Sequence, residues 1–247
     1  MIATIIRKEL MMLFISPLAW VLLAAIQLIL TWFFLIRLDA FLEIQPQMLQ
    51  IANPPGVTEM IVSPVFALAA IVLMMIAPVL SMRLFAEERR NHTLGFLLAA
   101  PVSITAIVLG KFLALMIFFA IIVILIALLS LSLLLGGVLD MGLIASNLLG
   151  LFFLTACFSA LGLYFSSLTA QPAIAAVTSL AALLGLWMID LAASETEGWL
   201  HYFSLLKYFR YFNQGLIDTL AISYFLLFMV AFLVLTIRRL EGERLHD

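Results

Sequence analysis

The stretch that decides the fold is FAEERRNHTLGFLLAAPVSITAIVLGK, residues 85–111. Four consecutive charged residues, Glu87 to Arg90, stand between two long apolar runs. A short apolar segment follows them and stops at Pro101, because proline cannot continue a helix. A chain that only crosses lipid needs a turn at such a place, not a charged segment with a helix of its own. The stretch therefore predicts a surface for a partner in the cytosol.

The chain as a whole is apolar enough for a membrane. Of its 247 residues, 66% are hydrophobic and 11% are charged, whereas soluble domains are about 45–50% apolar and about 25% charged. The apolar residues fall in runs of about 20, the length of a helix that crosses a bilayer. We predict an all-α integral membrane protein with a single domain, residues 1–247, and six spans, at about 17–36, 64–82, 107–135, 143–168, 173–192 and 219–237.

The N-terminal residues 1–16 predict an amphipathic helix. Apolar residues recur at helical spacing from Ile2 to Phe14, while Arg7, Lys8 and Glu9 group on the other side. A helix of this kind lies in the membrane interface. We therefore expect an elbow helix along the membrane, which ends at Pro17, where the first span begins.

The basic residues predict the orientation of the spans, because cytoplasmic segments are enriched in Lys and Arg. Nine of the twelve lie on one side of the predicted spans: Arg7, Lys8, Arg83, Arg89, Arg90, Lys111, Arg238, Arg239 and Arg244. The other three, Arg37, Lys207 and Arg210, lie on the opposite side. This difference predicts that both termini are cytoplasmic.

Residues 91–103 carry the signals of a short helix beside the charged residues. Asn91 or Thr93 offers a side-chain oxygen that can cap a helix over residues 94–100, and Ser103 can cap the third span. The leucines give the short helix an apolar surface, so it either docks a cytosolic protein or lies passively in the interface. The charged residues before it either face solvent or form ion pairs, with a partner or with the elbow helix.

The outer segment 194–218 is rich in aromatic residues, which favour the boundary between membrane and water. It predicts one or two short helices that turn at Gly215. Lys207 and Arg210 lie on this segment and either extend to lipid headgroups or contact an anionic substrate group or an outer partner. Asp190 is the nearest approach to an ionisable group at depth, of the kind that ion-coupled transporters use, or it is a boundary carboxylate.

The sequence lacks the motifs that several classes of function require. No P-loop or nucleophile motif occurs, so we expect neither catalysis nor ATP binding by this chain. Adjacent glutamates beside His92 resemble part of a zinc site, but the other histidines lie elsewhere and no set of converging ligands assembles. The net charge of −2 gives no sign of nucleic acid as a partner. We expect no metal and no cofactor on this chain.

The charged stretch resembles the first cytoplasmic loop of the permeases of the type-2 (ABC-2) family of ABC exporters. The resemblance rests on Glu87-Glu88-Arg89-Arg90, Thr93-Leu94, Leu97-Leu98-Ala99-Ala100-Pro101-Val102-Ser103 and Gly110-Lys111. The outer stretch 208–218, followed by Tyr224-Phe225, is similar to the gliding-motility permease GldF and the related permease NosY. Two positions depart from the family pattern, because His92 replaces its usual glycine and Gly95 its usual glutamate. Gly95 lowers helix propensity by roughly 1 kcal/mol relative to alanine, so we expect the short helix to be held by its partner.

The resemblance implies a half-transporter in the inner (plasma) membrane of a bacterium. Two permeases, identical or homologous, would pair, and cytosolic ATPase subunits that hold ATP and Mg²⁺ would dock on the coupling helices. Membrane lipid and an outer or periplasmic accessory protein are further partners that we expect. An alternative is a mechanochemical subunit of the gliding or assembly type, which moves no solute. The residues expected to couple to the ATPase are Glu87, Glu88, Arg89, Arg90, Thr93, Leu94, Leu97, Leu98, Pro101 and Lys111, and the outer candidates are Lys207, Arg210, Gly215 and Asp218.

Overall fold

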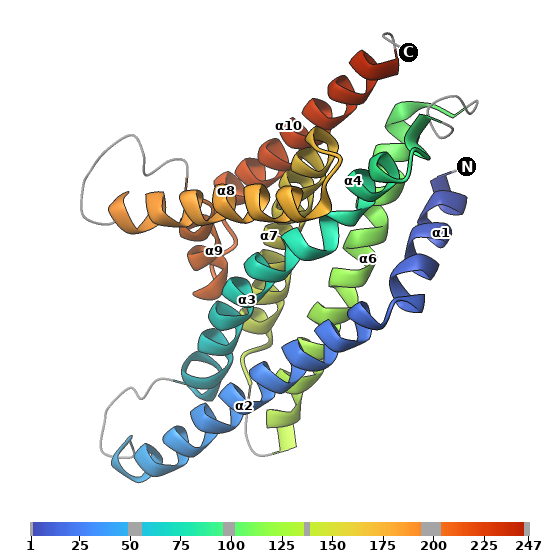
Figure 1. The fold of residues 1–247 in the computed structure, drawn as a ribbon. Coiled ribbons are helices and arrows are strands. Elements are labelled where there is room, and N and C mark those ends of the chain that lie inside the picture. Colours follow the sequence, from blue (N-terminus) through green and yellow to red (C-terminus); the bar gives the residue numbers. More distant parts are fainter. Residues whose placement is uncertain (1, 49–55, 96–101, 136–138, 194–203, 245–247) are drawn as a thin grey trace.

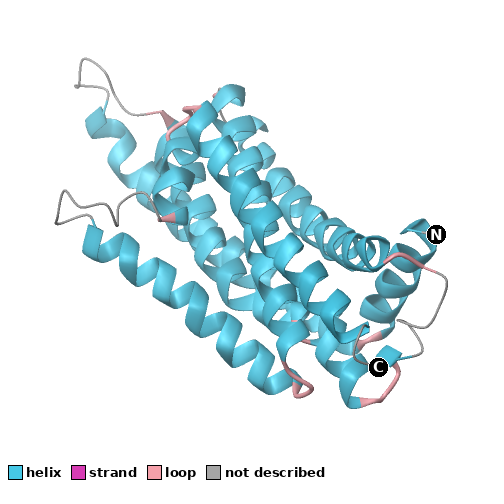
Figure 2. Cartoon of the chain, turned by 90° about the horizontal axis from the view of Figure 1, so that it is seen from above, coloured by secondary structure: helices cyan, strands magenta, loops and turns pink. Residues whose placement is uncertain are grey.

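The computed structural model describes residues 2–48, 56–95, 102–135, 139–193 and 204–244 (Figure 1). These residues form helices and short loops, without a strand among them (Figure 2). Six of the helical stretches are long and apolar enough to cross a membrane, as expected for an all-α membrane protein. The helices are α1 (Ile2–Ile15), α2 (Pro17–Met48), α3 (Ser63–Ser81), α4 (Arg83–Arg90), α6 (Ile104–Leu131), α7 (Met141–Leu168), α8 (Pro172–Ala193), α9 (Leu205–Asn213) and α10 (Thr219–Arg244), with a π-helical turn (Thr58–Val62) before α3 and a 3₁₀ turn (Ser132–Leu135) after α6.

The charged residues 87–90 lie on a helix and not in a loop, which corrects the expectation from the sequence. They form the last turn of α4, which continues the second long helix after a break at Met82. Glutamate and arginine are good helix formers, so charge alone did not end the helix. Other helices also run past the expected spans, to Met48 in α2 and to Arg244 in α10. A helix end does not mark the edge of the lipid, so the span limits stay predictions.

The helix α7 is the centre of the bundle. Of its most apolar 18-residue segment 67% is buried, against 22% in α2 and in α10 and 17% in α8. The small residues of α7 permit this position, as they do in packed membrane helices. A Cβ atom at Gly162 would overlap Oγ of Ser81 on α3, so the two helices cross in close contact. The outer helices α2, α8 and α10 therefore carry apolar faces that suit lipid.

The break between α3 and α4 is filled by a side chain of α7. Pro78 sits inside α3, and the helical ladder is interrupted at Met82. Ser166 Oγ accepts hydrogen bonds from the backbone N–H groups of Phe85 (3.1 Å) and Ala86 (3.2 Å) and donates one to the carbonyl of Met82 (2.9 Å). Insertion of a side chain into the ladder is a recognised cause of a helix kink.

Both chain termini lie at the same end of the molecule, together with α4 and the start of α6 (Figure 1). The far ends of α2 and α6 lie at the opposite end (Figure 1). With six long helices that each cross the molecule, the chain returns to the end at which it started. The charged residues of α1, α4 and the last turns of α10 are thereby gathered at one end.

Candidate functional site

Lys111 is the centre of a charged cluster at the end of the molecule that holds the termini. Its side chain is 1% exposed, although it belongs to a long apolar helix, α6. The ammonium group donates to Glu9 Oε1 (2.8 Å), Glu88 Oε1 (2.8 Å) and the carbonyl of Leu84 (2.7 Å). Lysine carries three N–H donors, so all of them are used. A buried charge is tolerated only with partners of this kind.

Three helices supply the side chains of this Lys111 cluster, which we define as Lys8, Glu9, Glu88 and Lys111. Lys8 Nζ lies 3.2 Å from Glu88 Oε1 and 3.6 Å from Glu9 Oε1, so two ammonium groups face two carboxylates. Partial burial lowers the pKa of Lys8, but the carboxylates of Glu88 and Glu9 outweigh it, and the net shift is upward. Lys8 is therefore protonated at neutral pH.

The position of Glu9 differs from the expectation that it lies on the polar side of the first helix. Glu9 is 4% exposed and shares the buried side of α1 with Leu13. The physical reason is Lys111, whose charge on α6 can be reached only by a carboxylate on that side. A Cβ atom at Gly110 would lie 2.8 Å from Cγ2 of Ile5, so glycine lets α1 approach α6 closely. Of the alternatives for the charged stretch, an ion pair with the N-terminal helix is present, between Glu88 and Lys8 of α1.

Arg89 forms a second ionic link, from α4 to α10. Its Nη2 atom lies 2.7 Å from both carboxylate oxygens of Glu243 and also donates to the carbonyl of Ser167 (2.7 Å). Both charged side chains are 22% exposed. No local pattern in the sequence distinguishes Glu243, which stands in a charged C-terminal segment. Of the other two charged residues in the stretch, Glu87 is half-buried and Arg90 is exposed.

The end of α4 closes with backbone hydrogen bonds that the sequence did not predict. The N–H of Thr93 donates to the carbonyl of Glu88 (2.9 Å) and the N–H of His92 to that of Arg89 (3.1 Å). This is the Schellman arrangement, which places a left-handed residue after the C-cap. That residue is His92, with a φ of 54°. Asn91 is thus the C-cap of α4, not the start of the next helix.

The residues that follow α4 are described only in part. Leu94 is buried, and Leu94 and Gly95 are helical. Leu97, Leu98 and Pro101 lie outside the described residues, so the short coupling helix stays a prediction. Ser103 caps α6 as expected, because its Oγ accepts from the N–H of Ala106 (3.3 Å).

The outer candidates have structural partners. Asp190, which is 5% exposed, accepts from Nη2 of Arg210 (2.7 Å) and from the hydroxyl of Ser204. The ammonium group of Lys207 lies 5.7 Å from the centre of the Tyr208 ring. The ion pair of Asp190 with Arg210 joins the end of α8 to α9.

Gly215 and Asp218 shape the connection from α9 to α10. Gly215 has a φ of 82° and ends α9 with a second Schellman arrangement. Asp218 caps α10, because its Oδ1 accepts from the N–H of Leu220 (3.0 Å). Within the described part of the chain no group of three or more His, Cys, Asp or Glu side chains could hold a metal ion.

A comparison with protein families identifies one relationship. The family model described as ABC-2 family transporter protein matches residues 3–241, which is nearly the whole chain. A comparison with curated proteins gives no match.

Proposed function

The chain belongs to the ABC-2 transporter family and is a multi-pass membrane permease component of an ABC transporter, and we propose that α4 and the segment after it couple this component to its ATPase. Permeases of this family are transport subunits that are not catalytic themselves, and the family implies an ABC ATPase as partner. ATP and Mg²⁺ would be held by that partner. The proposed setting is the bacterial inner membrane, with both termini cytoplasmic and a second permease beside this one.

The observation that carries the proposal is the way α4 is tied to the rest of the bundle. Glu88 joins it to α1 and α6 through the Lys111 cluster, and Arg89 joins it to α10. A displacement of residues 94–101 by the ATPase would therefore move α4 together with α1, α6 and α10. ATPase closure can shift the spans only by the difference in interaction energy between two conformations, and breaking or remaking these ion pairs would supply such a difference.

The polar groups inside the spans favour a lipid-like substrate, or force without any solute. The buried hydroxyls of Ser130, Ser159 and Thr236 donate to carbonyls of their own helices, four residues back. Hydroxyls that donate to their own helix in this way are not free to donate to a polar solute. This supports the second candidate function, a mechanochemical subunit driven by the same ATPase.

The test is co-purification with the candidate ATPase, followed by ATPase activity in nanodiscs. Leu97→Asp and Leu98→Asp should each detach the ATPase and abolish activity that depends on this chain, because a carboxylate cannot replace an apolar contact. Thr105→Asp is the matched control, since Thr105 is exposed in the first turn of α6, where an acidic residue suits the helix dipole. Unchanged co-purification of both leucine variants would contradict the coupling assignment.

A further inference from the structure

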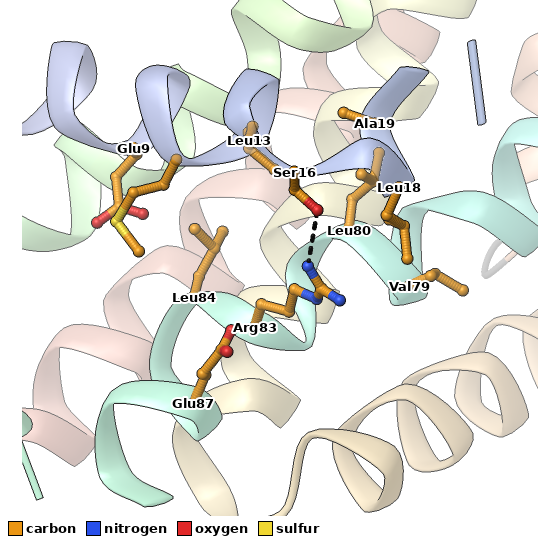
Figure 3. Close-up of a pocket in the computed structure, with 11 residues that line it drawn as sticks. Glu9, Leu13, Ser16, Leu18, Ala19, Val79, Leu80, Arg83, Leu84 and Glu87 are labelled. Atoms are coloured by element: carbon orange, nitrogen blue, oxygen red, sulfur yellow. Dashed lines mark hydrogen bonds between the residues drawn. The ribbon is translucent and has the colours of Figure 1, made fainter. Parts of the chain in front are cut away.

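A pocket of about 180 Å³ lies where α1 meets α2 and where α3 meets α4 (Figure 3). One liquid water fills about 30 Å³, so the space admits a group several times larger. Apolar side chains line one part of the pocket, among them Leu18 and Val79, while Ser16, Arg83 and Glu87 line the other. Arg83 is the first charged residue after the apolar run of α3. The pocket therefore straddles the boundary between the apolar and the charged parts of the molecule.

Two oppositely charged side chains in this pocket, Arg83 and Glu87, form no ion pair with the described residues. Arg83 donates from Nη1 to Ser16 Oγ (3.3 Å), as Figure 3 shows, and has no ion pair among the described side chains. Glu87 stands one helical turn further and has no such ion pair either. The third ionised group, Glu9, differs from both because Lys8 and Lys111 neutralise it.

This combination defines the chemistry of a ligand. A guanidinium beside a hydroxyl suits a phosphate, a carboxylate four residues away suits an ammonium group, and apolar walls suit acyl chains. A phosphate and a primary ammonium joined by a short linker, on a lipid, form the headgroup of phosphatidylethanolamine. A choline headgroup has no N–H to donate to Glu87, and a glycerol headgroup has no positive charge.

We propose that this pocket binds a phospholipid with a phosphoethanolamine headgroup, its phosphate on Arg83 and Ser16 and its ammonium group on Glu87. The lipid would hold the joint between α1 and α2 against the joint between α3 and α4. The proposal does not depend on ATPase coupling or on transport of a solute. It needs only a chain in a membrane and the lining of this pocket.

Native mass spectrometry of the purified full-length chain tests the proposal, with phosphatidylethanolamine, phosphatidylcholine and phosphatidylglycerol of identical acyl chains added in turn. We expect one retained phosphatidylethanolamine, preferred about tenfold over the other two lipids, which corresponds to about 1.4 kcal/mol. Glu87→Gln should abolish the preference over phosphatidylglycerol, and Arg83→Gln should lower retention of all three lipids. Arg83→Lys, which keeps the charge, should retain binding, and so should the control Arg7→Gln on the exposed side of α1.

Three results would overturn the proposal. The first is a wild-type chain that does not prefer phosphatidylethanolamine, and the second is a preference over phosphatidylglycerol that survives Glu87→Gln. The third is full displacement of the lipid by soluble phosphoethanolamine, which would assign the pocket to a water-soluble ligand. None of these outcomes bears on co-purification with an ATPase, so the two proposals fail separately.

Discussion

At the scale of single residues, α4 and α9 both end at a residue in the left-handed backbone conformation, which is a histidine after α4 and a glycine after α9. Both helices close with the same pair of hydrogen bonds, at Gly215 after α9 and at His92 after α4. Their φ angles of 82° and 54° are both in the left-handed region. Glycine adopts it without steric cost, whereas an L-residue with a Cβ atom loses roughly 1–2 kcal/mol. His92 stands where the resembling permeases usually have glycine, so the departure noted in the sequence is a strained position.

His92→Gly should therefore stabilise the protein. We expect a gain of up to about 1 kcal/mol, because the relief of strain is partly offset by the larger freedom of glycine in the unfolded chain. His92→Val should lower stability, since a β-branched residue tolerates a positive φ least. The unfolding midpoint in detergent measures both variants, and Gly215→Ala, which creates the same strain at the other helix end, is the matched comparison. A loss of stability in His92→Gly would contradict this account.

At the scale of helices, the joint between α3 and α4 depends on one hydroxyl from α7. Ser166→Ala should cost about 1–3 kcal/mol, because it leaves the buried N–H groups of Phe85 and Ala86 without an acceptor. Ser179→Ala is the matched control, since Ser179 is equally buried but bonds only to carbonyls of its own helix, α8. Unfolding midpoints of the two variants measure the difference, and equal losses would show that Ser166 does not hold the joint.

The helices show which features of the fold a sequence reveals. Apolar runs predicted all six long helices, and local chemistry predicted the Ser103 cap. Hydropathy could not predict α4, because a group of charged residues lowers the mean hydropathy and therefore marks the end of an apolar run. In the structure the helix continues through these charged residues, and Glu88 and Arg89 form ion pairs with other helices. The partners Ser166 and Glu243 are 81 and 154 residues from Phe85 and Arg89. No local pattern reports contacts of such separation.

The same limit applies to the candidate site. Sequence and family resemblance selected Glu88, Arg89 and Lys111, and the structure brings Glu88 and Lys111 together. Glu9 was placed on the wrong side of its helix, because a period of 3.6 residues separates polar from apolar residues but cannot anticipate a buried lysine on another helix. Asp190 and Arg210 were each noted without their pairing, because the two side chains stand 20 residues apart on different helices, α8 and α9.

At the scale of the whole molecule, α4 is the element on which the ionic links at the end with the two termini converge. The Lys111 cluster holds it to the N-terminal helix, and the pair of Arg89 and Glu243 holds it to the C-terminal helix. The first and the last helix, α1 and α10, therefore both contact the helix that, under our proposal, receives the movement of the ATPase. An ion pair can transmit a displacement of α4 to another helix only while the pair is intact. If the pair of Arg89 and Glu243 is broken, α10 should no longer follow α4.

Reversal of the link between α4 and α10 tests this argument. Arg89→Glu places two carboxylates where an ion pair stood, so it should lower permease-dependent ATPase activity in nanodiscs several-fold while the ATPase stays bound. The double variant Arg89→Glu/Glu243→Arg restores opposite charges and should recover part of the activity. Recovery is incomplete, because a glutamate cannot donate to the carbonyl of Ser167 as Arg89 does.

The control for this reversal lies on the same helix, α10. Arg238 is exposed and has no ion pair among the described residues, so Arg238→Glu changes the charge by the same amount without breaking a link. We expect its activity to equal that of the unmodified chain. An Arg238→Glu variant as impaired as Arg89→Glu would attribute the loss to charge alone, and a double variant without recovery would show that α10 does not follow α4.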